Sequence, residues 1–150
     1  MRRFTLVAGL LAMSAAACQH NAGTGASPEF FPVAGPVARP FSAAVRVGDM
    51  LYLAGQIGTG SDGQIVSGGI AAETKQAMTN ISQVLAQHGS SLDRVVRCTV
   101  MMADMREWDA MNAVYSPFFP SHKPARSSFG TSGLALNARV EIECTAVVSA

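Results

Sequence analysis

Charged residues are scarce in this chain of 150 residues, since Asp, Glu, Lys and Arg together make up only 14% of it. Apart from Arg2 and Arg3, lysine and arginine form no cluster, whereas a nucleic-acid-binding protein needs a basic face to displace phosphate counterions. A nucleic-acid partner is therefore not expected. Apolar residues make up 49% of the chain, which is too many for a disordered protein. A chain of this length should fold as one domain around one core.

A long apolar run is also missing. The uncharged stretch at residues 4–17 is shorter than the roughly 20 residues that a transmembrane helix needs. It follows Arg2 and Arg3 and ends in small residues before Cys18, a pattern typical of a secretion signal. We expect residues 1–17 to be a signal peptide and Cys18 to be lipidated, giving an exported lipoprotein on the periplasmic face, in the outer rather than the inner membrane. Membrane contact would run only through this lipid anchor, and the alternative is a soluble secreted form.

Cysteine and histidine are few, and their positions bear on disulfides and metals. After Cys18, only Cys98 and Cys144 remain, and each lies on the apolar side of an alternating strand pattern. We therefore expect two buried free thiols, although an oxidising compartment would also permit a disulfide. The three histidines are scattered singly, so the sequence contains no metal-ligand spacing and predicts no metal site.

A change of composition divides the rest of the chain into two parts. Residues 18–38 are rich in Gly, Ala, Ser and Pro and nearly free of charge, which predicts a flexible linker attached to the lipid. Phe30 and Phe31 are the exception and could dock onto the domain. Residues 39–150 should form that domain.

Alternating and helical spacings predict an α+β domain with the element order ββαβαββ. Two helices are expected, and the apolar spacing of the first makes it the more secure. The sheet should be mixed, with both helices on one face. If the other face is apolar, association of subunits would cover it. The expected strands lie at residues 42–47, 50–54, 95–102, 125–131 and 139–148, and the helices at 70–88 and 105–118.

Three stretches carry a resemblance that covers the whole domain. They are VGDMLYLAGQIG at residues 47–58, KQAMTNISQVLAQHGSSLDRVVRCTVMMADMREWDAMNAVYSPFF at 75–119, and KPARSSFGTSGLALNARVEIECTAVV at 123–148. Together they resemble the reactive intermediate deaminase (Rid, YjgF-like) family. The third stretch is the most specific, because Pro-Ala-Arg-Ser followed at this distance by Val-Glu-Ile-Glu is a signature of that family.

The resemblance implies a chorismate-mutase-like fold, a homotrimer with clefts between neighbouring subunits, and a function. Family deaminases hydrolyse small carboxylate-bearing imines and enamines, of the 2-aminoacrylate and 2-iminopropanoate type, to 2-keto acids and ammonia without any cofactor. By position, Arg126 matches the Arg that holds the substrate carboxylate, and a guanidinium fork suits that task. Glu141 matches the Glu that orients the attacking water. Ser128 matches a small residue of the site, and Gly55 a position where the backbone approaches the ligand.

Two positions depart from the family pattern. Phe41 stands where well-studied deaminases have a Tyr, and Ala54 stands where they have a Ser. Each change removes a hydrogen-bonding group from the expected cleft, which would shift the substrate preference towards a more apolar group or lower the rate. One such contact is worth about 0.5 to 1.5 kcal/mol.

Other interpretations of these residues remain open. Arg126 could pair a structural carboxylate, and Glu141 and Glu143 could form a polar stripe on one face of a strand. The chain could also be a non-catalytic trimeric module that binds small carboxylates, an alternative that Phe41 and Ala54 favour. An endoribonuclease would need a basic groove, which this sequence lacks.

Overall fold

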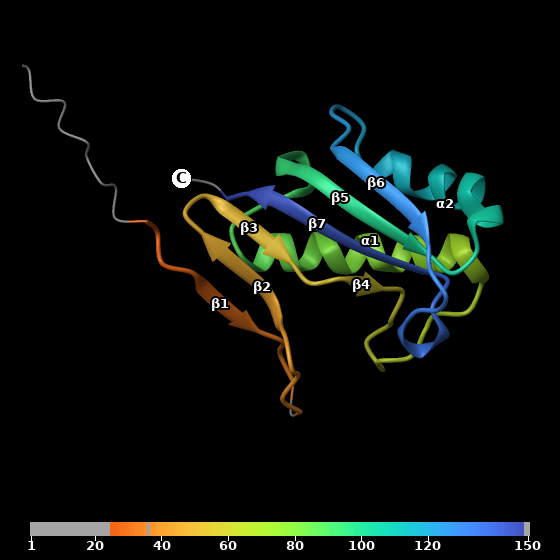
Figure 1. The fold of residues 1–150 in the computed structure, drawn as a ribbon, viewed down its shortest axis with the longest axis horizontal. Coiled ribbons are helices and arrows are strands. Elements are labelled where there is room, and N and C mark those ends of the chain that lie inside the picture. Colours follow the sequence, from red (N-terminus) through yellow and green to blue (C-terminus); the bar gives the residue numbers. More distant parts are fainter. Residues whose placement is uncertain (1–24, 36, 149–150) are drawn as a thin grey trace, which may run out of the picture.

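The computed structural model describes residues 25–35 and 37–148, which form one mixed sheet and two α-helices (Figure 1). Short 3-10 turns lie at Leu92–Arg94, Met105–Glu107, Ser116–Phe118 and Ala135–Asn137. The elements in chain order are β1 (Glu29–Pro32), β2 (Ser42–Val47), β3 (Met50–Leu53), β4 (Gln56–Ile57), α1 (Gly69–Gln87), β5 (Val95–Met102), α2 (Trp108–Tyr115), β6 (Ala125–Gly130) and β7 (Val140–Val147).

The strands lie in the order β1-β2-β3-β7-β5-β6, and the short β4 pairs with β7 beyond the end of β3. Only β5 and β6 run parallel, because the chain crosses over through α2 between them. All other pairs are antiparallel. The predicted α+β fold with a mixed sheet and two helices is confirmed. The structure adds β1 and β4 to the predicted order, and β6 forms one edge of the sheet.

Strand β1 lies within residues 18–38, for which the sequence predicts a linker. It pairs antiparallel with β2, and the Phe31 ring stacks on His88 at a centroid distance of 4.1 Å. Phe31 also packs against the core, whereas Phe30 is exposed. The folded unit therefore begins before residue 39, because an aromatic side chain anchors this segment. The predicted signal peptide and Cys18 lie outside the described residues.

Helix α1 forms where the apolar spacing predicts it. Its buried residues return to one face once per helical turn, and this face packs on the sheet. After the helix, Gly89 takes a positive φ of 77°, and the Ser90 amide donates to the Leu85 carbonyl at 2.9 Å, which caps the last turn. Among residues 25–35 and 37–148, no helix is long and apolar enough to cross a membrane. The buried face consists of Ile70, Glu73, Thr74, Ala77, Met78, Ile81 and Leu85.

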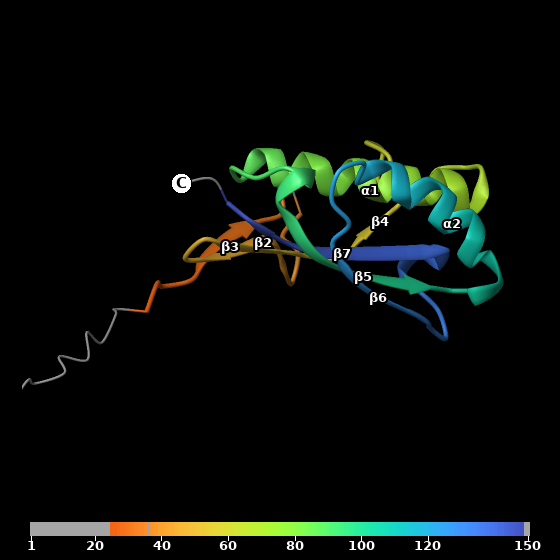
Figure 2. The same cartoon turned by 90° about the horizontal axis from the view of Figure 1, so that it is seen from above.

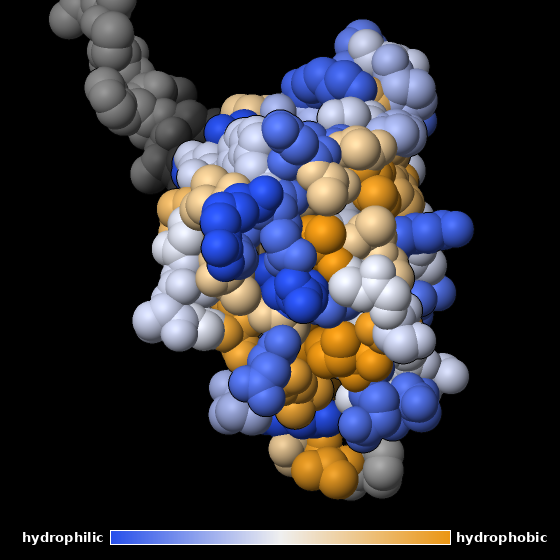
Figure 3. Space-filling model, turned by 90° about the vertical axis from the view of Figure 1, so that its right-hand side faces the viewer, coloured by the Kyte–Doolittle hydropathy of each residue, from blue (hydrophilic) through white to orange (hydrophobic). Residues whose placement is uncertain are grey.

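Both helices cover the same face of the sheet, and the opposite face has no covering layer within the described chain (Figure 2). Large apolar side chains are exposed on this open face, including Tyr52, Val96 and Phe129. A hollow of about 490 Å³ lies over β3, β5 and β7 on this face, and neither Arg126 nor Glu141 lines it. Figure 3 views the molecule from the right-hand side of Figure 1. It shows apolar side chains among polar ones on that surface.

The two cysteines of the domain form a disulfide, so the prediction of two free thiols is wrong. Cys98 on β5 and Cys144 on β7 are directly opposite in the antiparallel register, and their sulfur atoms are bonded. Both side chains are buried among the core residues, as the alternating pattern indicates. That pattern specifies the face on which each cysteine lies, but it does not specify the register that brings the two together.

Candidate active site

Arg126 lies on the edge strand β6, with its side chain directed towards the helices. In the register of the sheet it is next to Cys98, whose side chain is buried in the core. The Arg126 Cζ atom lies 5.0 Å from the ring centroid of Trp108 and 4.7 Å from that of Tyr115, both on α2. The arginine is half-buried and forms no ion pair or side-chain hydrogen bond with any residue of the described chain. Its N–H groups therefore remain available to a ligand.

Two hydroxyl groups with no partner lie on the same side of the sheet as Arg126. The Oγ of Ser128, two residues further along β6, and the Oη of Tyr115 are both buried and make no hydrogen bond within the described residues. Burial raises the pKa of Tyr115 to about 12, although the positive charge of Arg126 acts in the opposite direction. The tyrosine therefore stays neutral near pH 7.

Glu141 lies on β7 with its side chain on the open face of the sheet. Its strand alternates between buried Val140 and Ile142 and the outward-facing Glu141 and Glu143. The carboxylate lies against the backbone of Gly55, where an added Cβ would come 2.9 Å from Glu141 Cδ and 3.1 Å from its Cγ. Partial burial, and secondly the negative charge of Glu143, raise the pKa of Glu141 above its ordinary value of 4.5. A raised pKa suits a group that accepts and returns protons.

Within one protomer, the sheet register separates Arg126 and Ser128 from Glu141 and Gly55. Arg126 shares a row of the sheet with Cys98 and Cys144, whereas Glu141 shares a row with Met101 and Phe129. Three residues along a strand and two strand spacings across the sheet each correspond to roughly 10 Å. The two side chains also point to opposite faces. One protomer therefore brings Glu141 and Gly55 together, but leaves Arg126 and Ser128 apart from them.

The two positions that depart from the family pattern lie near the β2–β3 hairpin. Ala54 directly precedes Gly55, and its amide donates to the Ala43 carbonyl at 3.0 Å. Phe41 precedes β2, and its ring is exposed. Ala54 is thus adjacent to the Gly55–Glu141 contact, whereas the structure gives Phe41 no comparable contact with Arg126 or Glu141.

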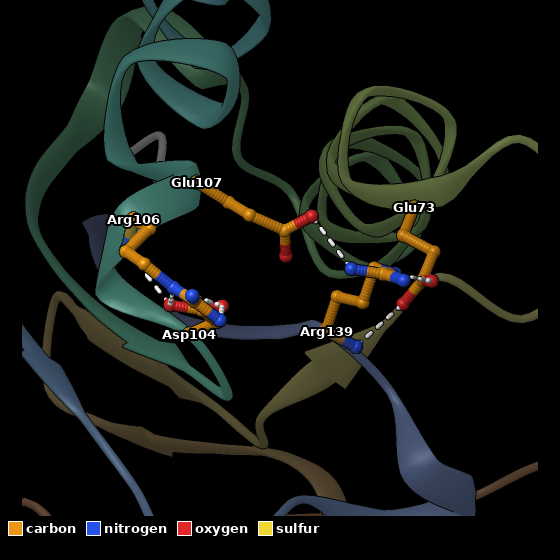
Figure 4. A network of polar contacts seen from close by, with 5 residues as sticks. All are labelled: Glu73, Asp104, Arg106, Glu107 and Arg139. Atoms are coloured by element: carbon orange, nitrogen blue, oxygen red, sulfur yellow. Dashed lines mark hydrogen bonds and ion pairs between the residues drawn. The ribbon is translucent and has the colours of Figure 1, made fainter.

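A polar network at the entrance to β7 was not predicted from the sequence (Figure 4). The backbone N–H of Arg139 donates to Glu73 Oε2 at 2.7 Å. The Nη1 of the Arg139 side chain donates to Glu107 Oε1 at 2.6 Å. Glu73 is buried on α1, and Glu107 directly precedes Trp108. The network therefore joins both helices to the strand that carries Glu141. One signal was present in the sequence, because Glu73 is an acid on the apolar face of α1.

The described residues contain no group of three or more His, Cys, Asp or Glu side chains that could hold a metal ion. The available chemistry is that of Arg126, which can pair a carboxylate, and of Glu141, which can accept a proton.

Comparisons with known proteins extend over most of the chain. Residues 33–148 match the family described as Endoribonuclease L-PSP. The human 2-iminobutanoate/2-iminopropanoate deaminase is 40% identical over 109 residues, which cover 72% of this chain and 80% of the human protein. The mitochondrial protein MMF1 of Saccharomyces cerevisiae is 37% identical over 121 residues, which cover 81% of this chain and 83% of MMF1.

Solved structures share the fold. The crystal structure of yeast Mmf1 superposes with a TM-score of 0.73 at 36% identity, covering 84% of this chain and 98% of Mmf1. RidA from the Antarctic bacterium Psychrobacter superposes with a TM-score of 0.71 at 28% identity, covering 79% of this chain and 94% of RidA.

The comparisons correct the predicted location. The expectation of an exported, periplasmic lipoprotein is wrong, because relatives of this chain are named as a mitochondrial protein in yeast and as a chloroplastic deaminase in Arabidopsis thaliana. The misleading feature was an N-terminal segment with a basic start and no acidic residue before Glu29. Such a composition is also typical of presequences other than bacterial export signals, so it does not identify a compartment.

Proposed function

Because the chain belongs to the Endoribonuclease L-PSP family, which includes the YjgF and reactive intermediate deaminase proteins, we propose that it hydrolyses small reactive imines and enamines. The substrates are of the 2-aminoacrylate and 2-iminopropanoate type, and the products are a 2-keto acid and ammonia. The human, bovine and goat relatives named 2-iminobutanoate/2-iminopropanoate deaminase support this assignment at 40 to 42% identity. No cofactor takes part in the proposed reaction.

The proposal rests on the surroundings of Arg126, which has aromatic neighbours and no acidic partner within the described chain. Arg126 is half-buried and its guanidinium lies against two aromatic rings, yet no acid in the described chain pairs with it. A partly desolvated cation with free N–H groups favours an anionic ligand, and a guanidinium binds a carboxylate through two parallel hydrogen bonds. A purely structural arginine would be expected to pair an acid instead.

We further propose that the active site forms between protomers of a homotrimer. Within one chain, Arg126 and Glu141 lie on opposite faces of the sheet, too far apart to act on one small molecule. Arg126 lies on an edge strand that a neighbouring protomer can approach, and the apolar open face needs a cover. In this arrangement Arg126 and Ser128 of one protomer face Gly55, Ala54 and Glu141 of the next. Sedimentation velocity tests this, and Val96→Asp on the open face should yield monomers without activity.

The proposed reaction proceeds by addition of water to the imine carbon. An enamine first takes a proton on its terminal carbon to become the imine. Arg126 then holds the carboxylate while Glu141 accepts a proton from the attacking water, and the electron pair of the C=N bond moves to nitrogen. Glu141 returns that proton to the nitrogen, which gives a carbinolamine. Glu141 then passes the hydroxyl proton to the same nitrogen, and the C–N bond breaks as the C=O bond forms, so that ammonia leaves. The products are the 2-keto acid and ammonia.

Phe41 and Ala54 bear on the substrate preference. Ala54 lies beside Gly55 and offers no hydroxyl group to a ligand there, so we propose that this site favours an apolar substrate side chain. The same two residues support the alternative of a trimeric module that binds small carboxylates without converting them.

One assay separates these functions. A serine or cysteine lyase generates 2-aminoacrylate in place, and release of keto acid is followed with wild type, Arg126→Ala and the control Arg94→Ala, which removes an exposed arginine elsewhere. Acceleration that Arg126→Ala abolishes and Arg94→Ala preserves supports the deaminase. No acceleration, together with saturable carboxylate binding in calorimetry, supports the module. Salt-sensitive RNA cleavage that survives Arg126→Ala would overturn both.

A further inference from the structure

The two aromatic rings beside Arg126 belong to the first and last residues of α2. Trp108 and Tyr115 are seven residues apart, so they lie two turns apart on the same side of the helix. The Arg126 Cζ atom is 5.0 Å from one ring centroid and 4.7 Å from the other. Two turns span about 10 Å along the helix axis, so the rings flank the guanidinium rather than stack on each other.

A cation–π contact leaves the N–H groups of a guanidinium free to bind a carboxylate. The face of an aromatic ring attracts the positive charge of a guanidinium, whereas a carboxylate accepts hydrogen bonds from the N–H groups at the edge of the guanidinium. An acidic side chain in place of the rings would occupy the same N–H groups as the substrate. Aromatic contacts therefore hold the side chain in one orientation and leave its donors available.

The hydroxyl group of Tyr115 does not account for the contact. Its Oη is buried and has no hydrogen-bond partner within the described residues, whereas its ring is in contact with Arg126 and lies 5.1 Å from the Phe119 ring. The ring alone should be sufficient at this position, which makes phenylalanine the conservative substitute.

We propose that Trp108 and Tyr115 are positioning residues that orient Arg126 for the substrate carboxylate, an inference that rests on the proposed function. Trp108 is the single tryptophan of the chain, so its fluorescence reports on this site alone. Occupation of Arg126 by an anion changes the electric field at the indole ring.

The first test is a fluorescence titration of the wild-type protein. Propionate serves as the probe, and the neutral, similarly shaped propionamide serves as its control. We expect a saturable change in Trp108 emission with propionate, none with propionamide, and none with propionate in Arg126→Ala. If calorimetry shows propionate binding that depends on Arg126 while the emission stays constant, the inference is overturned.

The second test is steady-state kinetics of substituted proteins. Trp108→Leu and Tyr115→Leu should each raise KM for 2-aminoacrylate by about three- to thirty-fold, the range expected for loss of a cation–π contact, with a smaller effect on kcat. Trp108→Phe and Tyr115→Phe keep a ring and should recover most of the loss. Ala113→Ser changes an exposed residue of the same helix and leaves both rings and the core intact, so it should leave KM unchanged.

The outcomes distinguish the inference from the function on which it rests. Activity in the wild type with unchanged KM in folded Trp108→Leu and Tyr115→Leu overturns the inference and leaves the deaminase intact. A wild type with no activity but with an Arg126-dependent fluorescence response overturns the deaminase and supports the aromatic positioning of a carboxylate-binding arginine.

Discussion

Gly55 lies directly against the carboxylate of Glu141, so a methyl group at position 55 would come within 2.9 Å of Glu141 Cδ. The backbone between β3 and β4 thereby supports the side chain that we assign to proton transfer. Gly55 is absent from the residues with a positive φ, so its role is to leave space rather than to permit an unusual backbone conformation. This distinction makes the contact testable by one substitution.

Gly55→Ala should lower kcat/KM by roughly 10- to 100-fold, because Glu141 has to turn away from its position and misplaced catalytic groups lose about this much. The atoms in the way belong to the end of a flexible side chain, so the thermal midpoint should change little. Gly60→Ala is the matched control, since its nearest neighbour is Asp62 Oδ1 at 3.2 Å and it lies away from Glu141. Equal losses in both variants would contradict the assignment.

The loss of activity at the acidic end of the pH profile should reflect protonation of Glu141. Burial, and secondly Glu143, raise its pKa above 4.5, and the carboxylate has to be ionised to accept a proton from water. Activity should therefore fall as the pH decreases through a value above 4.5. Glu143→Gln removes the second cause and should move the limb of kcat/KM to lower pH. A limb that stays in place in Glu143→Gln and persists in Glu141→Gln belongs to another group.

The same pKa predicts a cost in stability. A carboxyl group whose pKa is raised on folding stabilises the protein fully below its unfolded value, and this contribution is lost as the pH rises through the folded value. Glu141→Gln carries no charge and should therefore be more stable than the wild type near pH 7, with the difference shrinking below pH 4.5. Urea unfolding at both pH values measures it. A variant that is less stable at neutral pH would disprove the predicted direction.

Reduction of the Cys98–Cys144 disulfide should destabilise the domain. The bond closes a loop between residues 46 apart in the sequence, and a loop of this size is worth about 4 kcal/mol in the chain-entropy estimate. Urea unfolding with and without dithiothreitol should show a loss of this order. Alkylation in denaturant without reductant should leave Cys98 and Cys144 unlabelled, and labelling of both would show that the bond is absent.

Glu73→Ala should lower the free energy of unfolding by about 1 to 3 kcal/mol, because it leaves the Arg139 amide without its buried acceptor. Glu73→Gln keeps an acceptor oxygen and should lose less. Urea unfolding of the two variants compares them directly. If both lose the same amount, the negative charge matters more than the hydrogen bond to the Arg139 amide.

Much of the fold could be predicted from local patterns. The six-residue strand Ser42–Val47 and the helix Gly69–Gln87 lie where alternation and helical spacing predict them, because each period reflects one buried face. Strand β1 was missed, since its four residues carry too short a pattern and depend on Phe31 packing against His88. Strand β4, with only two residues, left no pattern to detect.

The sequence by itself supplied Arg126 and Glu141 as candidates for the proposed site, and it determined that Glu141 and Glu143 share one face of their strand, because residue type and alternation are local properties. Only the tertiary structure decided that Cys98 lies opposite Cys144, that Arg126 lies between two rings of α2, and that Arg126 and Glu141 point to opposite faces of the sheet. Strand register and helix placement follow from the packing of the whole core, and no short stretch of sequence contains the residues that settle them.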